Sequence, residues 1–253
     1  MDKAKEWAIR CYHEAQLHEE NSYVTFTYRD EDLPEDRSVD VRHFQLFMKR
    51  LRKNTGVKVR YFHCGEYGEQ TKRPHYHALL FGYRPTDQRF YKRSKGHPIY
   101  TSESLDQTWG LGHCNFGNVT FESAGYVARY IMKKVTGEVA EGHYSSFINP
   151  DTGELLTVRP EYVTMSRNPG LGADWVRKFR EDLNGDYVVV DGKKHSIPRF
   201  YDEEIKRLDE KELALRKRNR KAAARKHAAN NTRERLAVRE KIQYARLNQL
   251  RRS

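Results

Sequence analysis

The sequence predicts an α+β fold, with a central antiparallel sheet flanked by helices and a helical, basic C-terminal tail. Strand and helix patterns follow one another in the order β-α-β-β-β-α, which is typical of a small domain on an antiparallel sheet. From residue 202 onward, alanine, leucine and charged residues dominate. The length accommodates one ordinary domain and an appendage, so we predict a domain at residues 1–198, with its core at about 20–183, and a tail at 199–253.

The first half of the chain contains a strand, a helix and a hairpin. Residues 23–28 alternate and are rich in β-branched and aromatic types, so they predict a strand. Ser38 is the expected N-cap of a helix that ends at Gly56, because apolar residues recur between them at helical spacing. Residues 57–67 and 75–83 then predict two antiparallel strands joined by a polar turn.

The second half is less regular. Residues 84–112 carry arginine, glycine and proline in a weak pattern and predict an insertion or long loop. Strand character returns at 113–121, and a second helix is expected over 123–137. Residues 138–160 predict a loop with a turn at 149–153. A short helix and a hairpin are expected beyond it, at residues 174–183, 187–190 and 194–197.

Composition excludes several classes of protein. Hydrophobic residues make up only 37% of the chain, and no stretch approaches the roughly 18 apolar residues of a membrane span. The N-terminus lacks the apolar segment of a secretory signal. The three cysteines form no CxxC pair, so neither a disulfide framework nor a cysteine zinc site is indicated. We expect a soluble, unprocessed protein of a reducing cytoplasm, with no membrane partner.

Positive charge is concentrated at the C-terminal end. Residues 199–253 hold 18 lysines and arginines against 8 acidic residues, whereas the rest of the chain holds 29 against 27. Such an arm suits salt-sensitive binding of phosphate groups. The alternative is a solvated helical tail or a helix that pairs with a partner.

Two histidines begin an apolar strand. His75 and His77 are two residues apart, so their imidazoles face the same side of the sheet and suit one metal ion. A bare pair of this kind is more often two ordinary histidines. If Glu66 lies opposite His75 in the hairpin, it adds a carboxylate; Glu69, in the turn, is an alternative ligand. Zinc would accept this donor set, and phosphate chemistry would favour Mg²⁺ or Mn²⁺.

The second predicted helix carries two tyrosines four residues apart, Tyr126 and Tyr130, which share a helix face. At about 100° per residue they fall opposite an apolar stripe and beside Lys133 and Lys134. The stripe consists of Ala124, Val127, Ala128, Ile131 and Val135. Phenols beside cations suit attack on a phosphodiester. Exposed tyrosines that stack on bases or pack under a loop are the alternative.

Four segments together resemble a known family, the HUH-type rolling-circle replication initiators of small single-stranded DNA phages, specifically the gokushovirus-like microviruses. They are residues 23–28, 64–68 with 73–78, 125–134, and 163–172. Their order and spacing also match, and the resemblance covers about residues 20–180. It implies an RRM-like sheet with the tyrosine helix alongside, and a divalent metal, usually Mg²⁺ or Mn²⁺, held by His75, His77 and Glu66.

The resemblance also implies an activity. Tyr126 and Tyr130 would act alternately as nucleophiles, assisted by Lys133 or Lys134, in an endonuclease that nicks the single-stranded DNA of the viral origin. The products would be a 5′-phosphotyrosine and a free 3′-OH, and the displaced strand would be rejoined later. Host helicase and polymerase are the expected partners, in the bacterial cytoplasm. A non-catalytic single-stranded DNA-binding protein and a zinc hydrolase without covalent catalysis remain as rivals.

Overall fold

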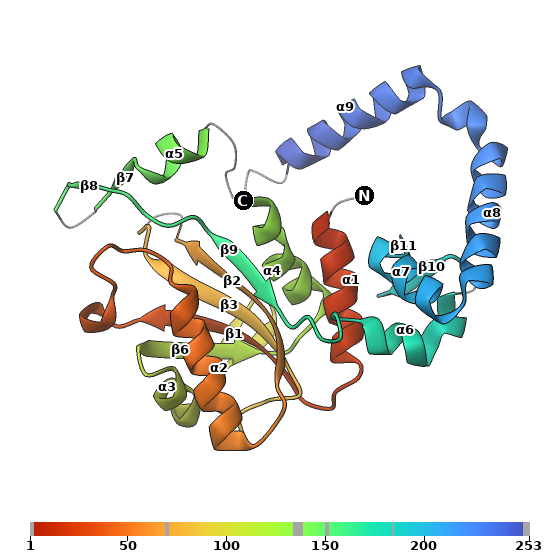
Figure 1. The fold of residues 1–253 in the computed structure, drawn as a ribbon. Coiled ribbons are helices and arrows are strands. Elements are labelled where there is room, and N and C mark those ends of the chain that lie inside the picture. Colours follow the sequence, from red (N-terminus) through yellow and green to blue (C-terminus); the bar gives the residue numbers. More distant parts are fainter. Residues whose placement is uncertain (1–2, 69–70, 134–138, 150–151, 184, 250–253) are drawn as a thin grey trace.

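A computed structural model of the protein describes residues 3–68, 71–133, 139–149, 152–183 and 185–249. Its centre is a seven-stranded antiparallel sheet with the strand order β4-β5-β6-β1-β3-β2-β9 (Figure 1). The predicted α+β class is therefore confirmed. The strands of this sheet are β1 (Asn21–Tyr28), β2 (Arg60–Tyr67), β3 (Pro74–Phe81), β4 (Arg89–Ser94), β5 (His97–Thr101), β6 (Gly112–Gly117) and β9 (Tyr162–Met165).

Helices cover both faces of the sheet (Figure 1). One face packs against α2 (Val41–Thr55) and α3 (Glu103–Trp109), and the other against α1 (Lys3–Ala15) and α4 (Phe121–Lys133). Strand β1 serves both, because successive side chains of a strand point to opposite faces. Its buried apolar residues, headed by Phe26, face α2, and its other face presents hydroxyl-bearing side chains toward α4.

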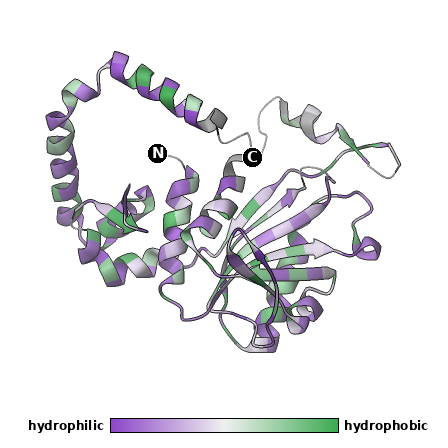
Figure 2. Ribbon diagram, turned by 180° about the vertical axis from the view of Figure 1, so that it is seen from behind, coloured by the Kyte–Doolittle hydropathy of each residue, from purple (hydrophilic) through white to green (hydrophobic). Residues whose placement is uncertain are grey.

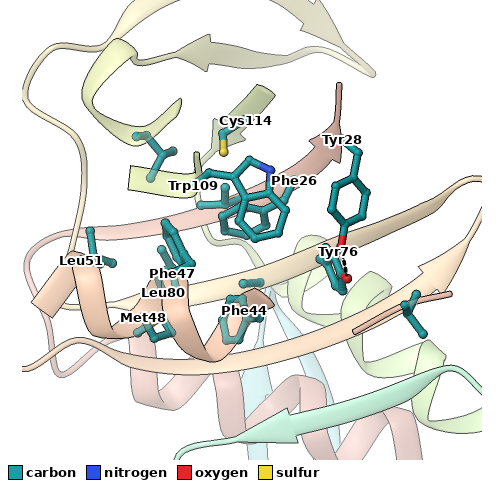
Figure 3. Close-up of a cluster of buried hydrophobic side chains, with 14 of the residues drawn as sticks. Phe26, Tyr28, Phe44, Phe47, Met48, Leu51, Tyr76, Leu80, Trp109 and Cys114 are labelled. Carbon is teal, nitrogen blue, oxygen red and sulfur yellow. Dashed lines mark hydrogen bonds between the residues drawn. The ribbon is translucent and has the colours of Figure 1, made fainter. Parts of the chain in front are cut away.

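The α2 face holds an aromatic core (Figure 3). Phe26 packs edge-on against Phe47, with ring centroids 4.8 Å apart, and lies 5.2 Å from the Trp109 ring. Tyr76 points into the same core, where its hydroxyl lies 2.5 Å from that of Tyr28 (Figure 3). Burial of such rings contributes about 1.5 to 3 kcal/mol each, so this cluster anchors α2 to the sheet.

Helix α2 begins one residue after Asp40, whose side chain accepts a hydrogen bond from the Arg42 amide. It ends at Gly56, which adopts a left-handed φ of 68°, as predicted. The predicted N-cap at Ser38 is wrong. Ser38 is buried, and its hydroxyl accepts from the Arg159 amide and so joins two distant segments instead.

The prediction of an insertion or long loop at residues 84–112 is also wrong in detail. This segment forms the β4–β5 hairpin and α3. The hairpin turns at Lys95 and Gly96, both with positive φ, and α3 is capped by Ser102 and ends at Gly110. Every residue of β4 is exposed, so the strand lacks the buried alternate positions from which a strand is predicted.

Several other elements differ from the expectation. Helix α1 and strand β9 were not predicted, and the predicted loop 138–160 contains a short helix and a two-stranded hairpin. Helix α4 begins at Phe121, where Thr120 and Ser123 each accept a hydrogen bond from the other's amide, a capping box. The elements of this region are α5 (Val139–Tyr144), β7 (Phe147–Ile148) and β8 (Leu155–Leu156), and the short 3₁₀ helix η1 (Asp30–Asp32) lies earlier in the chain.

The C-terminal part is helical, as expected. Its first helices pack on α1 through Tyr201 and Ile205, which are fully buried, whereas α8 and α9 extend away and are mostly hydrophilic (Figure 2). The domain boundary at residue 198 stays a prediction. No described helix is both long and apolar enough to cross a bilayer. The elements are α6 (Ala173–Phe179), η2 (Arg180–Leu183), β10 (Tyr187–Val190), β11 (Lys193–Ser196), α7 (Arg199–Leu208), α8 (Glu210–Lys226), η3 (Ala228–Asn230) and α9 (Arg233–Gln249).

Candidate metal centre

Three side chains of the β2–β3 hairpin converge on the α4 face of the sheet. The register pairs Glu66 with His75 and Cys64 with His77, as predicted. The His75 Nε2 lies 3.1 Å and the His77 Nε2 2.8 Å from Oε1 of Glu66. The three donor atoms all lie within 4.8 Å of one another. Strand pairing alone therefore assembles the predicted group.

The other ring nitrogens of the two histidines have partners that orient them. The Nδ1 of His75 lies 3.2 Å from the backbone carbonyl of Arg73, and a carbonyl can only accept, so this nitrogen carries the proton. The Nδ1 of His77 lies 3.0 Å from the hydroxyls of both Tyr23 and Thr25. Outer contacts of this kind fix imidazoles around metal ions and direct the Nε2 atoms to the centre.

The carboxylate of Glu66 is buried, with 3% of its surface exposed. Burial by itself would raise its pKa, but hydrogen bonds from His75 and His77 outweigh this and lower the pKa to about 2. Glu66 is therefore ionised at neutral pH, and it supplies a negative charge at the point where the two imidazoles meet.

The donor set fits a divalent cation. Two imidazole nitrogens and one carboxylate oxygen are a known ligand combination for zinc and other divalent metals, so residue types do not select one metal. The assignment of His75, His77 and Glu66 as metal ligands stays a prediction. Glu69, the alternative ligand, lies outside the described residues.

Tyr126 lies directly beside this group. Its ring meets the His77 ring edge-on at a centroid distance of 5.2 Å and the Tyr23 ring at 6.3 Å. The predicted apolar stripe is buried at Ala124, Val127 and Ala128. Tyr126 faces away from that stripe, yet it is half-buried rather than exposed, because the sheet covers this side of α4 as well.

The remaining predicted site residues are described only in part. Tyr130 and Lys133 belong to α4, but their side chains lie outside what the structure describes, as does Lys134 altogether. The described cation next to the tyrosine is Arg129, whose guanidinium carbon lies 5.6 Å from the centroid of the Tyr126 ring. Its spacing of three residues from Tyr126 was the available signal, because residues three apart are neighbours on a helix.

Tyr23 and Thr25 were also missed as residues of the site. They were assigned only to a strand, although their spacing of two places both on one face. Burial raises the pKa of Tyr23, so its hydroxyl stays protonated and serves as a hydrogen-bonding neighbour of His77. Only the pairing of β1 with β3, which sets Thr25 opposite His77, brings these hydroxyls to the site.

The segment 163–172 holds α1 in place behind the site. The Arg60 side chain donates to Glu14 of α1 at 2.5 Å and to the carbonyl of Pro169 at 2.8 Å. Glu14 also accepts from the Gly172 amide at 2.8 Å. This buried ion pair, with its hydrogen bonds made, joins α1, β2 and the segment that follows β9.

The chain is similar to replication-associated proteins of phages. It is 36% identical over 218 residues to the replication-associated protein VP4 of Bdellovibrio phage phiMH2K, a match that covers 82% of this chain and 64% of the relative. It is 30% identical to the replication-associated protein ORF4 of Chlamydia phage 1, covering 81% and 51%, and 27% identical to the replication-associated protein ORF2 of Spiroplasma virus 4, covering 85% and 67%. No solved structure matches the chain.

The chain thus spans about half to two thirds of the length of these relatives. Residues 21–135, which include β1, the hairpin with the three ligand candidates, and α4, match the family of the replication-associated protein ORF2. The resemblance inferred from the sequence motifs is confirmed at this level. This part of the chain belongs to the replication-associated protein ORF2 family.

Proposed function

We propose that the chain initiates DNA replication by nicking single-stranded DNA at an origin, with a tyrosine as the nucleophile. The observation that carries the proposal is the Tyr126 ring set 5.2 Å from the His77 ring of a group suited to a divalent cation. Family membership and the names of the phage relatives support a role in replication.

The covalent step balances as a transesterification. The Tyr126 oxygen bonds to the scissile phosphorus, the bond from phosphorus to the 3′ oxygen breaks, and the phenolic proton leaves while the 3′ oxygen gains one. The products are a 5′-phosphotyrosine and a 3′-OH that can prime synthesis. A divalent cation bound by Glu66, His75 and His77 would withdraw charge from the phosphate. Arg129, beside the Tyr126 ring, favours the phenolate and attracts the phosphodiester.

Rejoining needs a second nucleophile. Tyr130 is one turn further along α4, and the spacing of four residues sets both tyrosines on the same helix face. In this proposal one tyrosine nicks the origin and the other attacks the regenerated origin after one round, with Lys133 or Lys134 assisting. The phosphotyrosine conserves the energy of the phosphodiester bond for that second transfer.

The C-terminal helices supply the proposed auxiliary contacts. Helix α8 and helix α9 are exposed along most of their length and carry most of the chain's excess positive charge. They would hold DNA phosphates or recruit the host helicase and polymerase in the bacterial cytoplasm.

One experiment tests the proposal and its rivals. The protein is incubated with a randomised pool of single-stranded oligonucleotides and Mn²⁺, and denaturing gels detect covalent adducts, whose DNA is then sequenced. We expect an adduct with a defined cleavage site for the wild type and the control Tyr244→Phe, which alters an exposed tyrosine of α9. The Tyr126→Phe/Tyr130→Phe double variant should form none, and the single variants identify which tyrosine nicks.

Other outcomes favour the rivals. Hydrolysis that survives the double substitution would indicate a metal-dependent hydrolase without covalent catalysis. Binding without cleavage by the wild type, with Mg²⁺, Mn²⁺ or Zn²⁺, would indicate a single-stranded DNA-binding protein. Either result contradicts the nicking proposal.

A further inference from the structure

A pocket of about 360 Å³ lies between the tip of the β4–β5 hairpin and the first turns of α4. The hairpin contributes Lys95, His97 and Ile99, and the helix contributes Ser123, Tyr126 and Arg129. The volume is that of a small-molecule site and is enough for one nucleobase. The hairpin was predicted to be a loop without a function, so the sequence alone offered no reason to place it at a site.

The pocket adjoins the candidate metal centre. Tyr23 and Tyr126 line it, and both also contact His77: the Tyr23 hydroxyl lies 3.0 Å from His77 Nδ1, and the Tyr126 ring packs edge-on against the imidazole. A group held in the pocket would therefore lie next to any phosphate that Tyr126 attacks. This proximity ties the pocket to the proposed chemistry.

Three features set the hairpin over the helix. Its turn uses positive φ at Lys95 and Gly96, the geometry of a tight two-residue hairpin loop. Gly117 of β6 lets β5 approach closely, because a Cβ there would lie 3.3 Å from the carbonyl oxygen of Pro98. His97 at the tip lies 3.6 Å from Glu122 at the start of α4. The pocket is thus built by both elements together.

The walls of the pocket suit a base better than a phosphate. Ile99 and the Tyr126 ring are apolar surfaces on which a planar ring can pack. The Oδ1 of Asn118 accepts from Arg84 at 2.8 Å, so the groups that this side chain can still offer are N–H donors. Glu122 would repel a phosphate, but it can accept from the exocyclic amino group of a base.

The outer edge of the hairpin has the composition of a single-strand track. Residues 89–101 include four lysines and arginines and no acidic residue. Phe90 and Tyr91 are neighbours on β4 and are 61% and 57% exposed, and a register shift at this point disturbs the pairing with β5. Bulges often redirect side chains beside active sites. Exposed aromatics among cations are how proteins stack and hold unpaired nucleotides.

We infer that the β4–β5 hairpin is a single-strand DNA track that delivers an unpaired base into the pocket beside Tyr126. Phe90 and Tyr91 stack on nucleotides, the hairpin cations hold their phosphates, and the pocket receives the base that flanks the scissile phosphate. This inference rests on the proposed function for the identity of the scissile phosphate, but the binding of single strands by the hairpin is independent of cleavage.

The track is tested in EDTA, without metal or chemistry, by the fluorescence anisotropy of a labelled oligothymidylate. The Phe90→Ala/Tyr91→Ala variant should bind about 10- to 100-fold more weakly than the wild type. The matched control, Ile148→Ala/Leu155→Ala, removes two equally exposed apolar side chains from β7 and β8 and should bind as the wild type does. Unchanged binding by the hairpin variant would overturn the track.

The hairpin cations are tested separately. Lys92→Ala/Arg93→Ala should reduce the salt dependence of oligothymidylate binding by about one unit of log–log slope. If these cations matter equally for duplex DNA while the aromatic substitutions change nothing, the hairpin is a duplex-backbone contact and the inference is wrong.

The pocket is tested with the oligonucleotide that the wild type cleaves. Single bases are replaced by abasic sites, and kcat/KM for adduct formation is measured at each position. One position beside the scissile phosphate should lose about 10- to 100-fold in the wild type and little in Ile99→Trp, which fills the pocket, or in Asn118→Ala, which leaves the packing intact. Equal losses in wild type and variants would refute the pocket. If the wild type forms no adduct, the proposed function fails, while the anisotropy result still decides the track.

Discussion

The two faces of the central sheet are built from the same strands and differ in what they bury. On the α2 face, Phe26, Phe47 and Trp109 are fully buried in an aromatic cluster. On the α4 face, the neighbouring positions of the strands carry the Glu66, His75 and His77 group, which includes a buried charge. The difference shows how one sheet separates stability from chemistry, because the period of two sends adjacent residues to opposite sides.

The tripeptide 75–77 shows the separation most directly. Tyr76 lies between the two histidines in sequence, yet its ring packs with Phe26 and Trp109 on the other face. The imidazoles are therefore held by a strand whose middle residue is anchored in the core. A site mounted on such a strand keeps its geometry better than one on a loop.

The largest effect is expected from the α2 face. Phe47→Ala should lower the free energy of unfolding by about 3 to 5 kcal/mol, because it leaves a cavity among fully buried rings. Chemical denaturation measures this, with Gln45→Ala, an exposed change on the same helix, as the control. A loss below about 1 kcal/mol would mean that the core tolerates the cavity and that the two faces are less distinct.

Glu66→Gln should separate chemistry from stability. We expect adduct formation in Mn²⁺ to fall on the order of a thousandfold, equivalent to about 4 kcal/mol of activation free energy. Stability in EDTA should change little, since a residue of the same size remains. Calorimetric titration with Mn²⁺ gives a readout that does not depend on activity. Full Mn²⁺ affinity in Glu66→Gln, compared with the exposed control Glu35→Gln, would exclude Glu66 as a ligand.

Acid should weaken the anchoring of α1, the helix behind the site. Burial lowers the pKa of His13 to about 3. Below pH 6.5 the unfolded chain binds a proton that the folded chain does not, so the stability is complete above pH 6.5 and is lost as the pH falls. At pH 5 the loss is about 2 kcal/mol.

Unfolding of the wild type and His13→Gln at pH 7 and pH 5 measures this term. The variant should lose about 2 kcal/mol less than the wild type between the two values. Part of the acid sensitivity remains, because burial also lowers the pKa of His63. An equal pH dependence in both proteins would show that His13 titrates normally; His227→Gln, in the exposed tail, is the control.

The smallest effect tests the tripeptide. Tyr76→Phe removes a hydroxyl that contacts Tyr28 and accepts from the Asp40 amide at 2.8 Å, and it should cost about 1 kcal/mol. Adduct formation should be unchanged, because this hydroxyl lies on the α2 face. A large loss of activity at full stability would show that the two faces are coupled.

Much of the site was predictable because it is local. The hairpin register sets Glu66 opposite His75, and that register follows from the alternation of the two strands. Gly56 at the end of α2 and the hairpin turn at Asp191 and Gly192 followed from backbone preferences in the same way. These features depend on residues a few positions apart.

The missed elements depend on partners far away in the chain. Strand β9 pairs with β2 about a hundred residues earlier, and the buried contact of Glu14 with Arg60 joins segments that no local pattern relates. The exposed strand β4 lacks an apolar face, so its sequence gives no periodic signal. Its place in the sheet comes from pairing with β5.

By itself the sequence determined which side chains share a strand or helix face, because those periods are properties of the backbone. It thus gathered His75, His77 and Glu66 on one side and set Tyr126 opposite the apolar stripe of its helix. Only the tertiary structure decided that this helix packs with Tyr126 against His77, that Tyr23 and Thr25 join them, and that the hairpin tip meets α4. These contacts come from strand pairing and helix packing over long chain separations, which local periodicity does not encode.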